Sequence, residues 1–175
     1  VLNSDSYNNL DLSGINADGF AAKLGVGPGN IFRGCIAHNN ADDGWDLFNK
    51  IEDGPNASVT IENSVAYENG LPYNKADILK GSIGNGFKLG GEGQPVNHKV
   101  INSIAINNNM DGFTDNFNTG SLIVRNNIAM NNARYNYILR TNPYKFPSSI
   151  LFDNNYSIRD DWENKIKDFL GDTVN

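Results

Sequence analysis

The sequence predicts an all-β protein, a right-handed parallel β-helix with a short C-terminal helix. Three observations predict this fold class: short motifs that recur along the chain, brief segments rich in Val, Ile and Phe between them, and abundant asparagine and glycine. Asparagine and glycine tolerate the left-handed backbone that tight corners require. Helical repeat proteins show helical periodicity, which this chain lacks.

The first recurring motif ends in glycine followed by an aromatic residue. Its copies are Ala17–Phe20, Asp42–Trp45, Gly84–Phe87 and Met110–Phe113. Most copies are about 25 residues apart, which fits one β-helix turn with two or three short strands. The interval between Gly44 and Gly86 is longer, and it predicts a loop inserted at about residues 71–83. The four aromatic residues are expected to stack inside the helix.

A second motif alternates with the first, and it predicts another strand in each turn. Its copies are Gly34–Ala37, Asn63–Ala66, Asn102–Ala105 and Asn126–Ala129. Equivalent residues of stacked turns lie one inter-strand distance apart, at roughly 4.8 Å. A ladder of side-chain amides is therefore expected along Asn3, Asn63, Asn102 and Asn126.

The end of the chain changes character, so residues 1–159 are assigned to β-helix turns and 160–175 to an amphipathic helix and tail. Asp160 and Glu163 resemble a capping box. Apolar residues then follow at helical spacing, at Trp162, Ile166, Phe169 and Leu170. A helix at about residues 161–170 is expected to cap the open end of the stack. No matching cap is visible at the N-terminus, so the chain is expected to be an N-terminally truncated fragment.

Composition excludes several classes of function. The formal net charge is −6, which argues against a nucleic-acid-binding protein. No apolar run approaches the roughly 20 residues of a membrane span. The single cysteine, Cys35, excludes an internal disulfide framework. No signal peptide is visible. We expect a monomer that binds neither nucleic acid nor membrane.

Aligning the turns on the Gly-aromatic motif brings acidic residues together. One column holds Asp18, Asp43, Asn85 and Asp111, and another holds Ala21, Asp46, Lys88 and Thr114. Four aspartates, Asp18, Asp42, Asp43 and Asp46, thus crowd onto two turns, with Lys88 one turn further. Aspartates are also common at solenoid corners, where they cap turns. A cluster this dense favours a bound cation, and its all-oxygen ligands favour Ca²⁺.

At these residues the chain resembles the family-nine polysaccharide lyases, the pectate lyases of that class. The resemblance is carried by Asn16–Leu24, Gly27–Asn30, Phe32–Cys35, Asn39–Asp46 and Gly84–Gly91, within a match from about Asn3 to Asn132. It implies a secreted protein with a right-handed parallel β-helix. It further implies Ca²⁺ bound by the four aspartates, and Lys88 as the catalytic base.

A pectate lyase cleaves polygalacturonate by β-elimination, in which a base removes the proton at C5 of a uronate. A polyanionic substrate needs local cations, and Lys23, Arg33, Arg125 and Arg134 are candidates for carboxylate contacts. Two alternatives stay open. One is a β-helix glycoside hydrolase of pectin that uses two carboxyl groups, such as Asp43 and Asp46. The other is a non-catalytic carbohydrate-binding solenoid.

Overall fold

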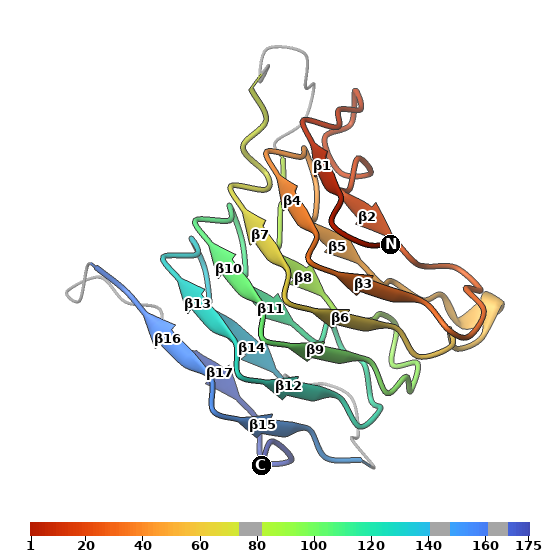
Figure 1. Cartoon of the computed structure of the whole chain (residues 1–175). Coiled ribbons are helices and arrows are strands. Elements are labelled where there is room, and N and C mark those ends of the chain that lie inside the picture. Colours follow the sequence, from red (N-terminus) through yellow and green to blue (C-terminus); the bar gives the residue numbers. More distant parts are fainter. Residues whose placement is uncertain (74–81, 141–147, 161–167) are drawn as a thin grey trace.

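The structure, a computed structural model, describes residues 1–73, 82–140, 148–160 and 168–175. These residues form seventeen short strands, β1 to β17, and the single 3-10 turn η1 (Ile51–Asp53). Every strand pair is parallel. The strands succeed one another in a fixed cycle through three sheets, so the chain is a parallel β-helix (Figure 1). No helix among these residues is long and apolar enough to cross a membrane.

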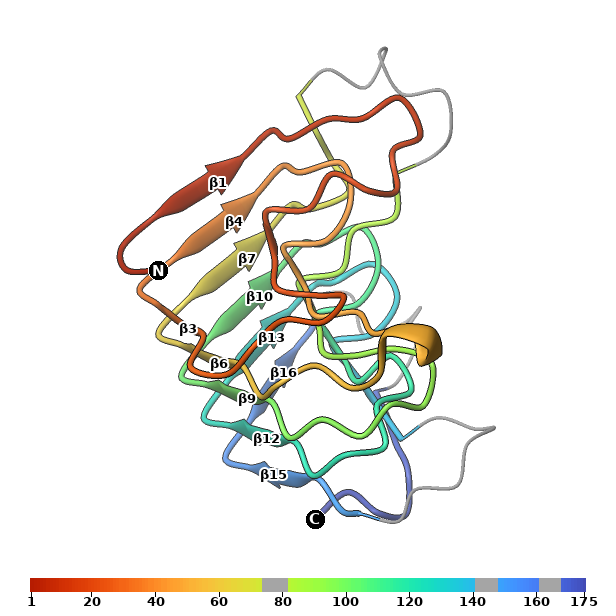
Figure 2. The ribbon, with the colours of Figure 1, turned by 90° about the vertical axis from the view of Figure 1, so that its right-hand side faces the viewer.

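The first sheet contains one strand from each of six turns, and Figure 2 shows these strands side by side in chain order. They are β1 (Asp5–Tyr7), β4 (Ile36–His38), β7 (Val65–Tyr67), β10 (Ile104–Ile106), β13 (Ile128–Met130) and β16 (Tyr156–Ile158). The middle residue of each strand points inward, and four of the six are alanines with little or no exposed surface.

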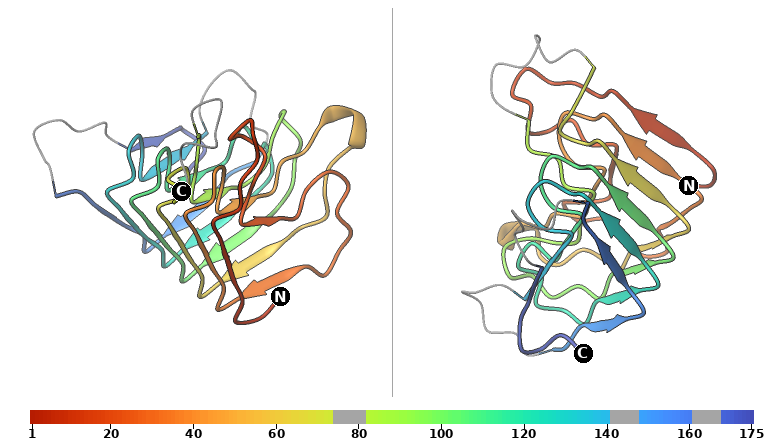
Figure 3. Two further views of the ribbon diagram at one scale, coloured as in Figure 1. Left: turned by 90° about the horizontal axis from the view of Figure 1, so that it is seen from above. Right: turned by 90° about the vertical axis from the view of Figure 1, so that its left-hand side faces the viewer.

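The second sheet carries the residues that the sequence singled out. Its strands are β2 (Phe20–Ala21), β5 (Trp45–Asp46), β8 (Phe87–Lys88), β11 (Phe113–Thr114), β14 (Tyr137–Leu139) and β17 (Phe169–Leu170). The third sheet closes each turn with β3 (Ile31–Arg33), β6 (Thr60–Glu62), β9 (Lys99–Ile101), β12 (Ile123–Arg125) and β15 (Leu151–Asp153). The views in Figure 3 show the same succession from one end of the stack to the other.

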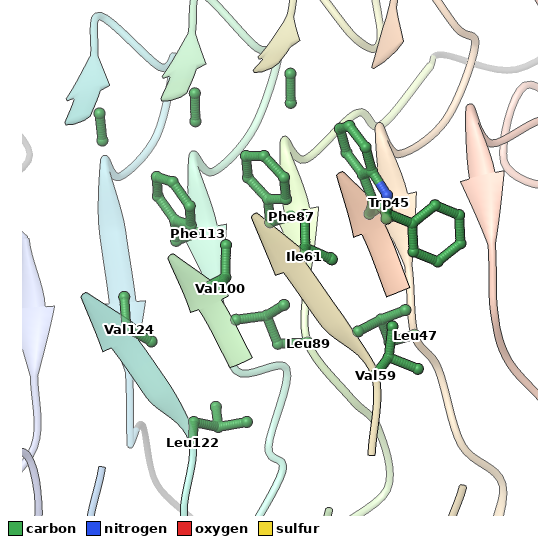
Figure 4. Close-up of a cluster of buried hydrophobic side chains, with 14 of the residues drawn as sticks. Trp45, Leu47, Val59, Ile61, Phe87, Leu89, Val100, Phe113, Leu122 and Val124 are labelled. Carbon is green, nitrogen blue, oxygen red and sulfur yellow. The ribbon is translucent and has the colours of Figure 1, made fainter. Parts of the chain in front are cut away.

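The predicted aromatic stack forms in the core. Trp45 and Phe87 stack with ring centroids 4.8 Å apart, and Phe87 and Phe113 repeat that spacing (Figure 4). Phe20 joins at one end, tilted by 30° at 5.0 Å from Trp45, and Tyr137 extends the stack at the other. Such aromatic pairs contribute roughly 0.5–1.5 kcal/mol beyond the burial of their surface. The aromatic position therefore fixes the register of the second sheet.

The predicted asparagine ladder is present from Asn63 onward. Amide hydrogen bonds join Asn102 to Asn63 at 3.2 Å, Asn126 to Asn102 at 3.1 Å, and Asn154 to Asn126 at 2.9 Å. These asparagines have positive φ, as a left-handed corner requires. The expectation that Asn3 belongs to this ladder is wrong, because glycine, at Gly34, occupies the turn between it and Asn63 and has no amide.

A second, buried asparagine ladder was not predicted. Amide hydrogen bonds of 2.8–2.9 Å connect consecutive turns along Asn9, Asn40, Asn69, Asn108 and Asn132, and all of these except the exposed Asn9 are buried. Within one turn, the Asn132 amide also donates to Asn136, four residues further along. The amides also cap backbone groups, as when Asn108 donates to the carbonyl of Ala66. A signal existed in the sequence, because an asparagine follows three residues after each inward alanine of the first sheet.

The predicted C-terminal helix is not supported. Residues 161–167, with Trp162 and Ile166, lie outside the described residues. Phe169 and Leu170 form strand β17, which pairs with Ile138 and Leu139 of β14. The open edge of β14 offers unpaired backbone groups, and an extended segment satisfies them where a helix would not. Helical spacing of a few apolar residues did not distinguish these two outcomes.

Candidate active site and metal centre

The outer face of the second sheet holds the acidic cluster, and strand register determines its layout. Ala21 pairs with Asp46, Asp46 with Lys88, and Lys88 with Thr114. The predicted column of outward residues is therefore confirmed. Each strand is only two residues long at this point, so each turn places one outward side chain directly after its buried aromatic ring.

Glycine precedes each of these strands because the turns approach one another closely there. A Cβ atom on Gly44 would lie 2.6 Å from the carbonyl oxygen of Gly86 and 2.8 Å from the amide nitrogen of Asn69. Real side chains do not reach such distances, so a substitution would push the turns apart. The glycine thus brings Asp43 and Asp46 close to the next turn, where Lys88 lies.

A second column of side chains lies just before the glycine of each turn, at Asp18, Asp43, Asn85 and Asp111. One side-chain oxygen of each residue accepts a hydrogen bond from the backbone of the next turn. The Oδ1 of Asp18 accepts the N–H of Asp43 at 3.3 Å. The Oδ1 of Asp43 accepts the N–H of Asn85 at 2.8 Å and its side-chain amide at 2.7 Å. In the same way Asn85 accepts the N–H of Asp111, and Asp111 accepts that of Tyr135. These bonds orient the carboxylates along the stack.

The second oxygen of each aspartate in this column faces a cationic side chain. Lys23 Nζ lies 2.8 Å from Asp18 Oδ2. Lys88 Nζ lies 3.0 Å from Asp43 Oδ2, a buried oxygen that has no aligned hydrogen-bond partner among the described residues. Further along the stack, Arg134 forms two hydrogen bonds to the carboxylate of Asp111, at 2.8 and 2.5 Å.

Asp46 links the two lysines. Its Oδ2 lies 2.5 Å from Lys23 Nζ, and its Oδ1 lies 3.5 Å from Lys88 Nζ. The same Oδ1 accepts the backbone N–H of Phe48 at 3.0 Å. Asp46 is nearly fully buried, so water screens these charges only weakly.

Three of the four predicted metal ligands converge on one point. Asp18, Asp42 and Asp43 each offer a ligand atom, and these atoms lie within 4.8 Å of one another. Asp46 is not part of this group, and its oxygens face Lys23, Lys88 and the N–H of Phe48. The donor atoms are carboxylate oxygens, which suit a hard cation such as Ca²⁺. The residues present therefore fit such an ion.

The electrostatics of the three aspartates also favour a cation. Burial raises the pKa of Asp18, and the nearby Asp46 carboxylate raises it further. Burial and the Asp43 carboxylate likewise raise the pKa of Asp42. Burial raises the pKa of Asp43 despite the opposing effect of Lys88. A positive ion at this point would relieve the repulsion that these shifts reflect.

Lys88 is held by more than the aspartates. Burial lowers its pKa, but the carboxylates of Asp43 and Asp46 outweigh burial, so the pKa lies above its ordinary value. Its Nζ also lies 5.4 Å from the ring centroid of Phe48, within the range of a cation–π contact. Phe48 packs close to Gly91, where a Cβ would lie 2.3 Å from the ring. Sequence reasoning missed Phe48, which lies outside both recurring motifs.

The four predicted substrate-binding cations separate into two groups. Lys23 and Arg134 lie at the acidic face of the second sheet, as described above. Arg33 and Arg125 lie on the third sheet, where they pair with Glu62 and Asp153 on the next turn. Arg33 ends β3 and Arg125 ends β12, so the structure does not bring these two arginines to the acidic cluster on the second sheet. Figure 1 shows the strands of the two sheets.

Known proteins share this architecture. A family model described as "Pel9A-like, right handed beta helix region" matches residues 1–158. A pectate disaccharide-lyase of Dickeya chrysanthemi is 54% identical over 160 residues, which is 91% of this chain and 20% of the relative. Pectate lyase L of Thermoclostridium stercorarium is 51% identical over 142 residues, 79% of this chain and 11% of the relative.

Solved structures give the same result. The crystal structure of pectate lyase Pel9A superposes with a TM-score of 0.83 and 38% identity, covering all of this chain and 40% of the other. A rhamnogalacturonan lyase superposes with a TM-score of 0.76 and 29% identity, covering 99% and 46%. The chain thus spans a fifth or less of these two curated relatives and less than half of these two solved structures.

Proposed function

Because the chain belongs to the Pel9A-like right-handed β-helix family, we propose that it carries the catalytic centre of a secreted, calcium-dependent pectate lyase. The resemblance to family-nine polysaccharide lyases is confirmed by this membership. One observation carries the proposal: a partly exposed lysine, Lys88, lies one turn beyond a cluster of aspartates that fits a divalent cation. The relatives named as pectate lyases supply the substrate class, polygalacturonate.

Asp18, Asp42 and Asp43 would hold the Ca²⁺, and Asp46 would join them once Lys23 releases it. Bound there, the ion would neutralise the uronate carboxylate and stabilise negative charge that develops next to it. Asn85 supports this role, since its two hydrogen bonds hold Asp43 Oδ1 and direct Oδ2, which faces Lys88, away from the backbone.

Lys88 would act as the base. The carboxylates of Asp43 and Asp46 favour the protonated amine, so Lys88 would act as a neutral base once a bound cation offsets them. That amine would take the proton from C5 of the uronate, the C5 electron pair would form the C4–C5 double bond, and the C4–O bond would break. The leaving oxygen takes a proton, and the new chain end is an unsaturated uronate. The Lys88 side chain is 20% exposed, so its amine can reach a sugar at the surface. Phe48 limits the volume that this amine explores.

Arg134 is proposed to contact the carboxylate of another uronate in the same polygalacturonate chain. Its Nε and Nη2 bind Asp111, which orients the guanidinium and leaves Nη1 without a hydrogen bond among the described residues. The side chain is 44% exposed. Arg134→Gln should raise KM for polygalacturonate by roughly tenfold with little change in kcat. An unchanged KM would contradict this contact.

The hydrolase alternative is weaker. It needs a protonated carboxyl group that reaches the glycosidic oxygen. Asp43 is fully buried and its Oδ1 is engaged by Asn85, so it is poorly placed to reach that oxygen. Hydrolysis also leaves no role for Lys88. A non-catalytic binding solenoid remains an outcome that the following experiment distinguishes.

The test compares wild type, Lys88→Ala and Lys88→Arg by the ultraviolet absorbance of unsaturated product from polygalacturonate at neutral pH with Ca²⁺. Lys88→Ala should lower the rate by roughly 10²- to 10⁴-fold, the usual contribution of a general base. Lys88→Arg should be nearly as inactive, because guanidinium stays protonated.

Lys99→Ala is the matched control, because Lys99 is exposed on strand β9 of the third sheet. It should retain the wild-type rate. An active Lys88→Arg variant would show that this lysine contributes only charge. Cleavage of polygalacturonate without unsaturated product would favour the hydrolase, and binding without cleavage would favour the non-catalytic solenoid.

A further inference from the structure

The elimination proposed above gives Lys23 no role. This lysine follows strand β2 by two residues, and its ammonium bridges aspartates from two successive turns. Lys23 Nζ is 2.8 Å from Asp18 Oδ2 and 2.5 Å from Asp46 Oδ2. The lysine side chain is 24% exposed, whereas both aspartate side chains are only 3% exposed. The ion pair is therefore largely shielded from solvent, and its attraction is stronger than that of a fully exposed ion pair.

The two oxygens that Lys23 occupies are the ones available for a metal. Asp18 Oδ1 already accepts the N–H of Asp43, and Asp46 Oδ1 already accepts the N–H of Phe48. Each carboxylate thus has one oxygen committed to the backbone and one oxygen directed at Lys23. A cation that draws on both aspartates needs the same Oδ2 atoms.

We infer that Lys23 is a built-in counter-ion of the acidic cluster, which competes with a divalent cation for the Oδ2 atoms of Asp18 and Asp46. This inference rests on the cation site in the proposed function. Cation binding by all four aspartates then requires the Lys23 ammonium to leave.

Two other roles for Lys23 give different results when its charge is removed. A lysine that only holds the aspartates in place would strengthen cation binding, so its loss would weaken the affinity. A lysine that only contacts the substrate carboxylate, as the sequence led us to expect, would leave the cation affinity unchanged. Of these three roles, only competition predicts that affinity rises.

The experiment is isothermal titration calorimetry of Ca²⁺ into chelator-treated protein without substrate. Lys23→Met should bind Ca²⁺ roughly tenfold more tightly than wild type, a change equivalent to one moderately strong ion pair. Lys23→Arg retains the positive charge and should bind no more tightly than wild type. Lys99→Met, which removes an exposed lysine from the third sheet, should match wild type.

A second readout does not depend on affinity. With chelator present, Lys23→Met should unfold at a lower temperature than wild type, because Asp18 and Asp46 lose their shared counter-ion. Adding Ca²⁺ should reverse this difference. Lys23→Gln, made in parallel, provides the same comparison if the methionine variant does not fold.

The inference is overturned if Lys23→Met and Lys23→Gln bind Ca²⁺ no more tightly than wild type, or if Lys23→Arg gains as much affinity as they do. In those cases wild type still binds the ion, so the proposed function stands. If wild type and all variants fail to bind Ca²⁺, the cation site of the proposed function fails together with this inference.

Discussion

Asp18 and Asp43 occupy equivalent positions on successive turns, and each uses its two carboxylate oxygens differently. One oxygen accepts a backbone N–H from the next turn, and the other faces a lysine ammonium group. Removing a carboxylate therefore affects both the stack and the site. Asparagine is the informative substitution, because its oxygen keeps the backbone hydrogen bond while the charge is lost.

Asp43→Asn should weaken Ca²⁺ binding by roughly tenfold or more, because the affinity of calcium sites depends on the number of charged ligands. Calorimetric titration measures it. Asp111→Asn is the matched control, since Asp111 has the same backbone role in the same column but pairs with Arg134. Equal affinities for Asp43→Asn and wild type would exclude Asp43 as a ligand.

The sequence predicted the positions of these residues on the second sheet, because those positions depend only on which residues stack. The glycine-aromatic motif determines the register, and register places Asp46 beside Lys88. The pairing of Lys23 with Asp46, and of Phe48 with Lys88, could not be predicted this way. Those contacts depend on the path of the chain after each strand, where the turns differ in length.

At the scale of the element, the two asparagine ladders differ mainly in burial. Asn108 has almost no exposed surface, and its amide joins Asn69, Asn132 and the carbonyl of Ala66. Asn102 lies in the outer ladder, whose bonds to Asn63 and Asn126 are exposed to solvent. Water can replace the outer bonds but not the inner ones.

Asn108→Ala should therefore lower the free energy of unfolding by about 3 kcal/mol, since it leaves several buried groups without partners. Asn102→Ala should cost about 1 kcal/mol or less. Denaturant titration followed by circular dichroism measures both. Comparable losses for the two variants would mean that burial does not control the strength of these ladders.

The spacing of apolar residues in the C-terminal segment fits a short strand as well as a helix. Apolar residues at helical spacing also satisfy a short strand when an open edge is near. Phe169 and Leu170 pair with β14 because that edge offers backbone partners. The sequence of the segment contains no information on where such an edge lies, so only the assembled stack decides between the two structures.

At the scale of the whole molecule, acid should weaken the fold through a buried histidine. Burial lowers the pKa of His98 to about 4, from an ordinary value near 6.5. Its Nδ1 accepts the N–H of Val59 at 3.0 Å, which only the neutral ring can do. The folded protein therefore excludes a proton that the unfolded chain binds.

The stability that His98 contributes should be fully present above pH 6.5. It should fall as the pH drops from 6.5 to about 4, by about 3 kcal/mol in total. The free energy of unfolding measured against pH tests this, with His98→Gln as the comparison. The difference between the two proteins should change across that window. A constant difference would show that His98 does not control acid stability.

The regular pairing of every turn has a consequence for how the acidic face of the second sheet can change. Neighbouring strands of the second sheet are held in one fixed register, at a spacing of roughly 4.8 Å. Along the stack, the distance between the backbone position of Lys88 and that of a residue on another turn can therefore change only by whole inter-strand spacings. Gaining or losing one turn would move the proposed carbohydrate contact at Arg134 by one such step and leave the proposed base at Lys88 in place. Substrate length preference and catalysis can thus evolve separately on the same scaffold.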